Sequence, residues 1–542
     1  MVVGPHKVYD YVIVGAGSAG CVLAYRLSED PNCRVLLIEA GGRDSNPLTR
    51  MPIAFLHTIR NPRLSWGYVS EPEPHLNDRR IVIPRGRVWG GSSTINGMFY
   101  MRGHSRDFDT WRQMGCEGWS YADVLPYFKR METSWRGAGP YHGGAGPLHI
   151  AAIDTRRLLH EPLISAAYAA GYPVNDDLHA ELEEGFARGE VTIDPNGRRS
   201  SSSRAYLRPA LKRANLTVQS KALTTRVLIE KGRAVGVEYV QRGKVQIAYV
   251  DREVVLSGGA YNSPQLLMLS GIGSADELTA VGIKPVLDLP GVGRNLQEHP
   301  YILLQFAARR PVTFLKELRV DRALRHGMEW MLFGTGPFAT QISSCNVVIR
   351  TRPELEQPDI QLMCNPVRLD AGIWLPWFSQ RQQHAFAAGV VQLHPQSRGW
   401  VKLRSADPAA PPAITLNLFS DPMDIAVMRR GIREARRIYR LGDQAALTGV
   451  EISPGVQIES DAELDDFICR EAATAHHPVG TCSMGINNEA VVDPELKVRG
   501  IAGLRVADAS IMPTVPGGNT NAPSIMIGEK ASDLILGRFA PT

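Results

Sequence analysis

The sequence predicts an α/β fold that begins with a strand, a glycine-rich turn and a helix, followed by a second buried strand. Three observations predict it. A run of β-branched and aromatic residues at 9–14 stops at a glycine, apolar residues then recur with helical spacing, and a second apolar run at 34–38 ends in a carboxylate. Strand, helix and strand in this order are typical of parallel strands joined by a crossover helix.

The first strand is expected over Tyr9–Val14 and the helix over Ser18–Glu29. Between them Gly15, Gly17 and Gly20 have the spacing G-x-G-x-x-G. The first glycine permits the tight turn, the second lets the backbone approach a pyrophosphate, and the third lets the helix pack closely on the strand. Unpaired N–H groups at the start of the helix, at Ser18, favour phosphate there.

The second strand, Arg34–Ile38, is followed by Glu39 and Ala40, so a carboxylate stands where a ribose hydroxyl would need an acceptor. Together with the glycine turn, this predicts an adenine dinucleotide site, without separating flavin from nicotinamide cofactors. The glycine pairs in 271–273 and 291–293 lack the third glycine and the strand-to-helix setting. We therefore expect one dinucleotide.

Composition excludes several classes of protein. With 542 residues, 44% of them hydrophobic and 21% charged, the chain is an ordinary globular one rather than disordered or fibrous. The formal net charge of +5 is too small to imply a nucleic-acid or membrane partner. No apolar run approaches the roughly 18 residues of a membrane span, so none is expected.

Cysteine usage and the N-terminus indicate the compartment. The seven cysteines are an odd number and lack C-x-x-C spacing, so we expect neither a metal site nor a disulfide framework. Only eight residues precede the first strand, which leaves no room for an export signal. A cytoplasmic location is expected.

Seven blocks of sequence along nearly the whole chain carry a more specific signal. They are Asp10–Gly20, Leu37–Gly42, Pro84–Gly97, Ser257–Leu267, Gly291–His299, His476–Thr481 and Gly503–Gly528. In this order they resemble the glucose–methanol–choline (GMC) oxidoreductases, FAD-dependent enzymes that mostly oxidise alcohols. Because all seven occur in sequence, the resemblance is highly specific.

The resemblance implies a Rossmann-like FAD-binding domain with an inserted, mostly antiparallel β substrate domain. The FAD domain is expected to comprise residues 1–155, 196–313 and 469–542, and the substrate domain residues 156–195 and 314–468. Strand-like segments at 216–218, 227–230 and 235–240 resemble the family's β-meander at the adenine. Val227 is the expected backbone partner of the base.

The loop Arg85–Gly97 is rich in glycine and small residues, as a backbone close to a planar ring must be. In relatives with covalent flavin a histidine stands in the place of Ile95. Isoleucine has no nucleophile, so FAD is expected to be noncovalent. The resemblance assigns Gly90, Gly91, Ser92, Asn96 and Gly97 to the flavin site.

The C-terminal block is expected to complete the cofactor site. A short strand from Gly503 delivers Asp508 and Ala509, which the resemblance assigns to the pyrophosphate and ribityl portion of FAD. A helix expected over Pro523–Leu536 follows a glycine-rich loop. Its N-terminus would face the part of the flavin that becomes negative on reduction.

His477 is the candidate general base, because histidine titrates near neutral pH and the family's catalytic histidine occupies this place. The family's second polar position is assigned to Asn521, whose amide would orient the substrate hydroxyl. His476 is equally consistent with substrate entry and with packing. The resemblance implies that His477 takes the hydroxyl proton while hydride passes to flavin N5. Oxygen or another acceptor would then reoxidise the flavin.

The substrate is expected to be an uncharged primary alcohol, aromatic or medium-chain, because the expected substrate domain contains the aromatic segment Trp374–Phe378. Choline would need a carboxylate for its ammonium, and the sequence identifies none. Choline dehydrogenation stays an alternative. So do a hydroxynitrile lyase-like or photodecarboxylase-like relative without ordinary alcohol turnover, and a catalytically silent FAD-binding protein.

Overall fold

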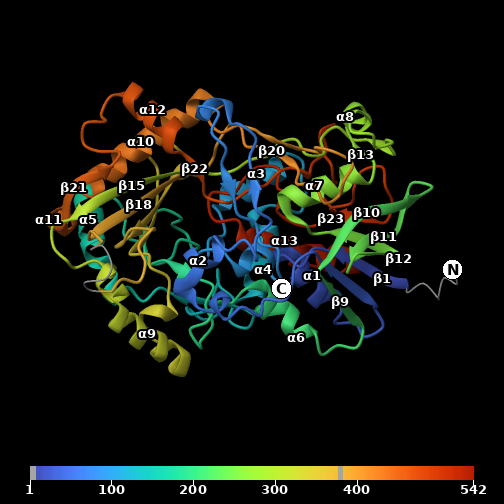
Figure 1. The fold of residues 1–542 in the computed structure, drawn as a ribbon, viewed down its shortest axis with the longest axis horizontal. Helices are drawn as coiled ribbons and strands as arrows, with labels where there is room; N and C mark the ends of the chain where they lie inside the picture. The colour runs from blue at the N-terminus through green and yellow to red at the C-terminus, as the bar shows by residue number, and fades with distance from the viewer. Residues whose placement is uncertain (1–7, 376–381, 542) are drawn as a thin grey trace.

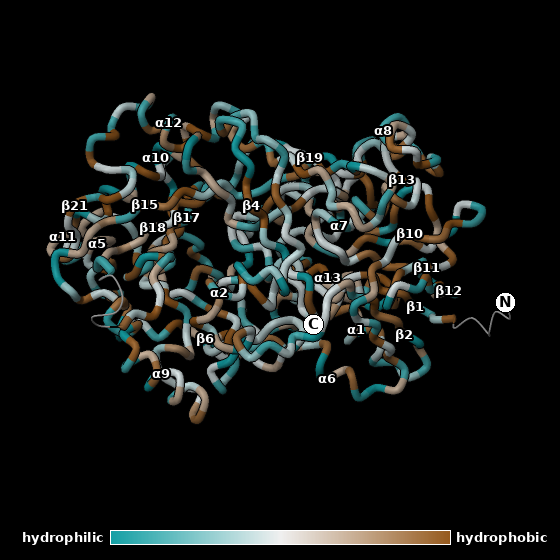
Figure 2. Tube along the Cα trace, viewed as in Figure 1, coloured by the Kyte–Doolittle hydropathy of each residue, from teal (hydrophilic) through white to brown (hydrophobic). Residues whose placement is uncertain are grey.

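The computed structural model describes residues 8–375 and 382–541. Two β-sheets lie toward opposite ends of its long axis, and helices pack around and between them (Figure 1). The hydrophobic stretches follow the strands of both sheets, whereas the connecting loops are largely hydrophilic (Figure 2). No helix in the described ranges is long and apolar enough to cross a membrane.

The first sheet contains the predicted parallel strands. β1 (Val8–Val14) pairs in parallel with β2 (Val35–Glu39) on one side and with β12 (Lys244–Leu256) on the other. The strand order is β10 (Ala222–Glu230), β11 (Arg233–Gln241), β12, β1, β2, β9 (Leu216–Ser220), and β23 (Leu504–Val506) lies beside β12. The expected meander is the antiparallel β10–β11–β12.

The central strands form because their side chains are apolar on both faces. All five residues of β2 are buried, and so are Tyr11–Val14 of β1, as expected for strands covered on both sides. Helix α1 (Ser18–Leu27) follows the glycine turn and packs against α13 (Asn521–Leu536). At the contact, Gly528 has no side chain to separate its helix from Ala19. The N-terminal ends of both helices therefore reach the same end of this sheet.

The second sheet is antiparallel throughout its described pairs, as the expected fold class requires. Its order is β21 (Thr448–Ser453), β15 (Pro300–Ala308), β18 (Ala385–Gln392), β17 (Ile360–Asn365), β16 (Cys345–Ile349), β7 (Gly185–Ala187), and β22 (Ala473–Thr474) lies beside β15. Helix α10 (Pro422–Ile438) packs on β18.

Two strands of the second sheet come from ranges that the sequence assigned to the FAD domain, and the domain boundaries themselves stay a prediction. β15 lies within 196–313 and β22 within 469–542, both assigned to the FAD domain, yet both pair in the second sheet. β15 follows directly on the block Gly291–His299, and the sequence becomes mostly apolar from Pro300 onward. The chain therefore enters the second sheet at Pro300.

The remaining elements connect and cover these sheets. The helices are α2 (Phe55–Ile59), α3 (Ser105–Gln113), α4 (Tyr121–Met131), α5 (His160–Ala170), α6 (Arg208–Ala210), α7 (Gly259–Leu269), α8 (Ala275–Ala280), α9 (Val320–Phe333), α11 (Gly442–Leu447) and α12 (Asp461–Glu471). The short strands are β3 (Tyr68–Val69), β4 (Val82–Ile83), β5 (Glu132–Ser134), β6 (Leu148–Ala152), β8 (Glu190–Val191), β13 (Ile272–Gly273), β14 (Leu287–Asp288), β19 (Trp400–Lys402) and β20 (Ala413–Thr415).

The glycines of the first turn differ in the room around them, and this gives a stability test. A Cβ at Gly20 would lie 1.9 Å from the carbonyl oxygen of Gly15, whereas the nearest atom to a Cβ at Gly17 is 3.7 Å away. We expect Gly20→Ala to lower the free energy of unfolding of the cofactor-free protein by about 3 kcal/mol. Gly17→Ala is the matched control and should change it by less than about 1 kcal/mol. Urea unfolding measures both, and equal losses would contradict this account of the turn.

Candidate active site

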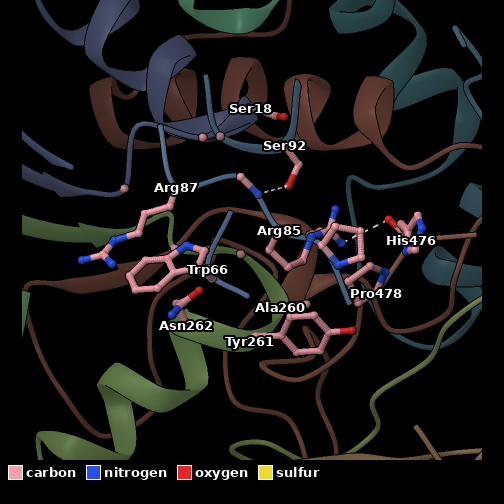
Figure 3. Close-up of a pocket in the computed structure, with 18 of the residues that line it drawn as sticks. Ser18, Trp66, Arg85, Arg87, Ser92, Ala260, Tyr261, Asn262, His476 and Pro478 are labelled. Atoms are coloured by element: carbon pink, nitrogen blue, oxygen red, sulfur yellow. Dashed lines mark hydrogen bonds between the residues drawn. The ribbon is translucent and has the colours of Figure 1, made fainter. Parts of the chain in front are cut away.

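A cavity of about 670 Å³ lies between the two sheets. It extends from the carboxyl ends of β1, β2 and β12 to Tyr301 on β15 and the loop after β22. In Figure 3, Trp66, Arg87 and Asn262 lie at one side of the view, and Arg85, His476 and Pro478 at the other. Most of the predicted cofactor residues line this cavity: Gly15, Gly17, Ser18, Glu39, Ala40, Gly91, Ser92, Asn96, Gly97, Asp508 and Ala509.

Glu39, the predicted acceptor for a ribose hydroxyl, lines the cavity. Its side chain is buried at the end of β2, where one oxygen accepts the N–H of Ala16 at 2.9 Å and the other that of Gly41 at 2.6 Å. Burial raises the pKa of Glu39, and the two N–H groups oppose that rise. A carboxylate oxygen has further lone pairs, so Glu39 can still accept from a hydroxyl in the cavity.

The start of α1 is open to the cavity. Gly17 caps the helix without a side-chain hydrogen bond, and the N–H groups of the first turn have no partner within the helix. A neighbouring loop supports the turn, because the N–H of Gly90 donates to the Ala16 carbonyl at 2.7 Å and Gly91 packs against Gly17. Gly90 and Gly20 therefore shape the site by backbone packing and do not line the cavity.

At the end of the cavity where the adenine is expected, Val227 does not form part of the lining. The N–H of Val227 donates to the Ser270 hydroxyl at 2.8 Å. Ala222, Leu223 and Thr224, at the start of the same strand β10, do line it. The buried hydroxyl of Thr224 has no hydrogen-bond partner. The meander therefore lines the cavity at the start of β10, and the expected contact of Val227 with the base stays a prediction.

At the opposite end, a buried arginine that the sequence reasoning missed holds the loop of Asn96. The Arg199 guanidinium donates at 2.7 Å to both the main-chain and the side-chain oxygen of Asn96, and its Nε donates to the Thr49 carbonyl. Burial lowers the pKa of Arg199 to about 9. Arg199 lies in none of the seven blocks, so no motif singled it out.

Asp508 fixes the C-terminal block against α7. One carboxylate oxygen accepts the N–H of Gly259 at 2.8 Å and the Ser263 hydroxyl at 2.5 Å, and the other accepts the N–H of Ser510. Asp508 and Ala509 follow β23 and line the cavity, as predicted. The first turn of α7 is thereby held beside the end of β23.

His477 is buried at the end of the cavity nearest the second sheet. Its Nε2 lies 2.9 Å from the Asn519 amide nitrogen, its Nδ1 lies 2.9 Å from Nδ1 of His299, and its backbone N–H donates to Glu298. Burial, with His299, His476 and Arg85 nearby, lowers the pKa of His477 well below 6.5. The imidazole is therefore neutral near pH 7, the form that can accept a proton.

Asn521 does not contact His477. It is the first residue of α13, and its side-chain oxygen accepts from the Ser18 hydroxyl at 2.8 Å. The asparagine beside His477 is Asn519, two residues earlier in the loop. The sequence contains both asparagines on either side of Thr520, and only the path of the backbone separates them. His476 lines the cavity too, with its carbonyl accepting from Arg85.

A family model described as GMC oxidoreductase matches residues 9–301, and a second with the same description matches residues 395–528. The chain belongs to the GMC oxidoreductases. This confirms the predicted family, the predicted fold and the predicted class of enzyme, an FAD-dependent oxidoreductase.

Curated relatives match this GMC oxidoreductase over almost its full length. A protein named choline dehydrogenase, mitochondrial, from Mus musculus is 45% identical, and the match covers 98% of this chain and 90% of the relative. The oxygen-dependent choline dehydrogenase of Brucella canis is also 45% identical, with 98% and 96% covered.

Solved structures of similar fold include oxidases with several names. Pyridoxine 4-oxidase from Mesorbium loti has a TM-score of 0.86 at 32% identity and covers 97% of this chain and 98% of its own. Formate oxidase from Aspergillus oryzae RIB40, in a mutant solved to study FAD modification, has a TM-score of 0.91 at 29% identity, with 98% of each chain covered. A fungal aryl-alcohol oxidase has a TM-score of 0.85 at 25% identity, with 98% and 99% covered.

The residues of this GMC oxidoreductase fit FAD. Glu39 offers a carboxylate that could accept from a ribose hydroxyl, the start of α1 offers free N–H groups and a positive dipole end, and Gly17 leaves room for a pyrophosphate. The unpartnered Thr224 hydroxyl and the unpartnered side-chain oxygen of Asn519 are buried polar atoms on the cavity wall. Such groups are expected to have a bound partner.

The two asparagines give a direct test of the site geometry. Asn519→Ala removes the amide beside His477, so flavin reduction by substrate should slow by about 10-fold or more while FAD content stays normal. Asn521→Ala, the matched control, removes the hydrogen bond to Ser18 at the start of α1 and should weaken FAD binding more than it slows reduction. Anaerobic stopped-flow absorbance and FAD titration measure the two effects. If Asn521→Ala slowed flavin reduction and Asn519→Ala mainly weakened FAD binding, Asn521 would be the residue that orients the substrate.

Proposed function

We propose that this protein oxidises an uncharged primary alcohol, aromatic or medium-chain, to the aldehyde. One observation carries the proposal: a buried, neutral His477 stands with Asn519 in a part of the cavity without a carboxylate. FAD supplies the hydride acceptor when bound.

In the proposed reaction His477 is the general base. Its Nε2 accepts the hydroxyl proton while the carbon bearing the hydroxyl loses hydride, so the alcohol becomes a carbonyl compound. Asn519 orients the hydroxyl through its amide, because an amide donates and accepts hydrogen bonds but is no base near neutral pH. The burial that keeps His477 neutral also excludes water from the proton transfer.

The lining supports an apolar substrate. Phe55, Phe99 and Tyr301 line the cavity beside Leu56 and Met363. Each Å² of apolar surface buried against such groups contributes about 25 cal/mol. In the predicted aromatic segment Trp374–Phe378, Trp374 does not line the cavity. Its indole N–H donates to the Leu315 carbonyl instead. Trp377 and Phe378 lie outside the described residues.

Charge argues against a cationic substrate. Among the described residues that line the cavity, the acidic ones are Glu39 and Asp508, and each accepts backbone N–H groups at the cofactor end. Glu298 lies near His477 but does not line the cavity, and burial raises its pKa to about 8. A quaternary ammonium would therefore have aromatic faces but no carboxylate as partners.

Choline is the second candidate, favoured by the names of the relatives at 45% identity. The lyase-like and photodecarboxylase-like alternatives gain no support, since the curated relatives and the solved structures described above are named as dehydrogenases and oxidases.

Further expectations follow for the cofactor and the compartment. We propose that FAD is noncovalent, because the cavity wall has Ile95 at the position where a histidine would attach it. Oxygen or another electron acceptor completes the cycle. A cytoplasmic location stays our prediction, beside the mitochondrial location in the name of the mouse relative.

A substrate panel separates the two candidates. Choline and 3,3-dimethylbutan-1-ol have nearly the same shape and differ in charge, so their ratio isolates the ammonium. We expect kcat/KM to be at least about 10-fold higher for the uncharged isostere, because the ammonium is desolvated without a carboxylate. The kcat/KM values for benzyl alcohol and for hexanol should exceed the value for glucose. Steady-state oxidation with an artificial electron acceptor gives these values, and a preference for choline would overturn the substrate proposal.

The pH dependence tests the base. Since the pKa of His477 is lowered, its neutral form is kept as pH falls through 6.5 and is lost only at lower pH. The rate constant for flavin reduction should therefore be flat from about pH 8 to 6.5 and decline below that range. His477→Gln should slow reduction by about 10²- to 10⁴-fold at every pH. An acid limb centred at or above pH 6.5 in the unsubstituted enzyme would be inconsistent with a buried neutral base.

A further inference from the structure

His299 lies behind His477, away from the cavity, and has no exposed surface. Its Nε2 is 2.9 Å from the Leu393 carbonyl oxygen, and its Nδ1 is 2.9 Å from Nδ1 of His477. The chain of contacts thus runs from a main-chain carbonyl through two imidazole rings to Nε2 of His477 and the Asn519 amide.

The chemistry of these atoms determines where each proton lies. A carbonyl oxygen only accepts, so Nε2 of His299 carries a hydrogen and donates to Leu393. Burial lowers the pKa of His299 to about 3, so its ring is neutral and its Nδ1 has a lone pair. The partner at 2.9 Å must then donate, which places a hydrogen on Nδ1 of His477. In a neutral ring this leaves Nε2 as the acceptor.

We propose that His299 is a positioning residue that holds His477 in the Nδ1–H tautomer and so directs the basic Nε2 toward the substrate hydroxyl. This inference rests on the proposed function, since it deepens the role of His477 as base. A third group that fixes the tautomer of a catalytic imidazole is a recognised device, and it acts without taking the proton itself.

The second sheet provides the geometry for this contact. β15 and β18 pair with Tyr301 opposite Val391, so two residues further along the same register His299 stands opposite Leu393. On the other side of β15, the carbonyl of His299 accepts the N–H of Ala475, two residues before His477. Strand pairing in the second sheet therefore fixes both Leu393 and Ala475 beside His299. Through these contacts the second sheet determines which nitrogen of His477 carries the hydrogen.

Two nearly isosteric substitutions separate the hydrogen bond from packing. His299→Leu removes the acceptor, and we expect flavin reduction to slow by about 10- to 100-fold, the range for leaving a buried N–H without a partner. His299→Asn places an amide oxygen near the position of Nδ1 and should recover most of that loss. FAD content should be unchanged in both. Equal slowing in the two variants, or no slowing in His299→Leu, would overturn the proposal.

The tautomer itself is a readout that needs no turnover. In ¹⁵N-histidine-labelled enzyme, long-range ¹H–¹⁵N spectra should show the His477 ring with Nδ1 protonated and Nε2 unprotonated, with the signal assigned by its loss in His477→Gln. A His477 ring protonated at Nε2 would overturn the proposal even if no His299 variant folds. Failure of every alcohol to reduce the flavin would instead count against the proposed function, and the spectrum would still decide the tautomer.

Discussion

Close main-chain contacts, possible only where side chains are absent, determine the shape of the cofactor half. A Cβ at Gly15 would lie 2.4 Å from the Ser257 carbonyl oxygen, and one at Gly91 would lie 2.8 Å from Cα of Gly17. These contacts join the end of β1 to the end of β12 and to the loop after β4, segments that are far apart in the sequence. Because the backbones touch, N–H groups at the start of α1 are left facing the cavity.

The other half of the site depends on burial without compensating charge. His477, His299 and His476 all have lowered pKa values, because desolvation penalises each imidazolium. Glu298, which accepts the N–H groups of His299 and His477, has its pKa raised to about 8 by the same burial. Near neutral pH the imidazoles of this site are therefore neutral and the Glu298 carboxyl is largely protonated. A neutral His477 can accept a proton from an alcohol directly, because it has no proton to release to water first.

How well the sequence predicts each feature depends on how far apart in the chain the contacting residues are. The strands near the N-terminus, helix α1 and the place of Glu39 at the end of β2 follow from patterns within a few residues, and these were predicted. The role of Glu39 toward a ribose stays a prediction. Val227 came from the family resemblance and not from a local pattern. The cavity lining on the same strand is at 222–224, and a contact of Val227 with the base stays a prediction. Asn519 and Asn521 differ only in backbone path. The contact of His299 with Leu393 depends on the pairing of β15 with β18, which no local pattern specifies.

The contrast between the two ends of the cavity bears on substrate choice. At the end that we assign to the cofactor, the described lining offers carboxylates and helix N–H groups, which are suited to hydroxyls and phosphates. At the base end, the described lining offers Asn519, His477 and apolar side chains. A desolvated cation–π contact returns about 2 kcal/mol or somewhat more, whereas desolvating an ammonium without a counter-charge costs more than that. An alcohol whose remainder is apolar has no such penalty, so the burial that keeps His477 neutral supports the uncharged substrate that we propose.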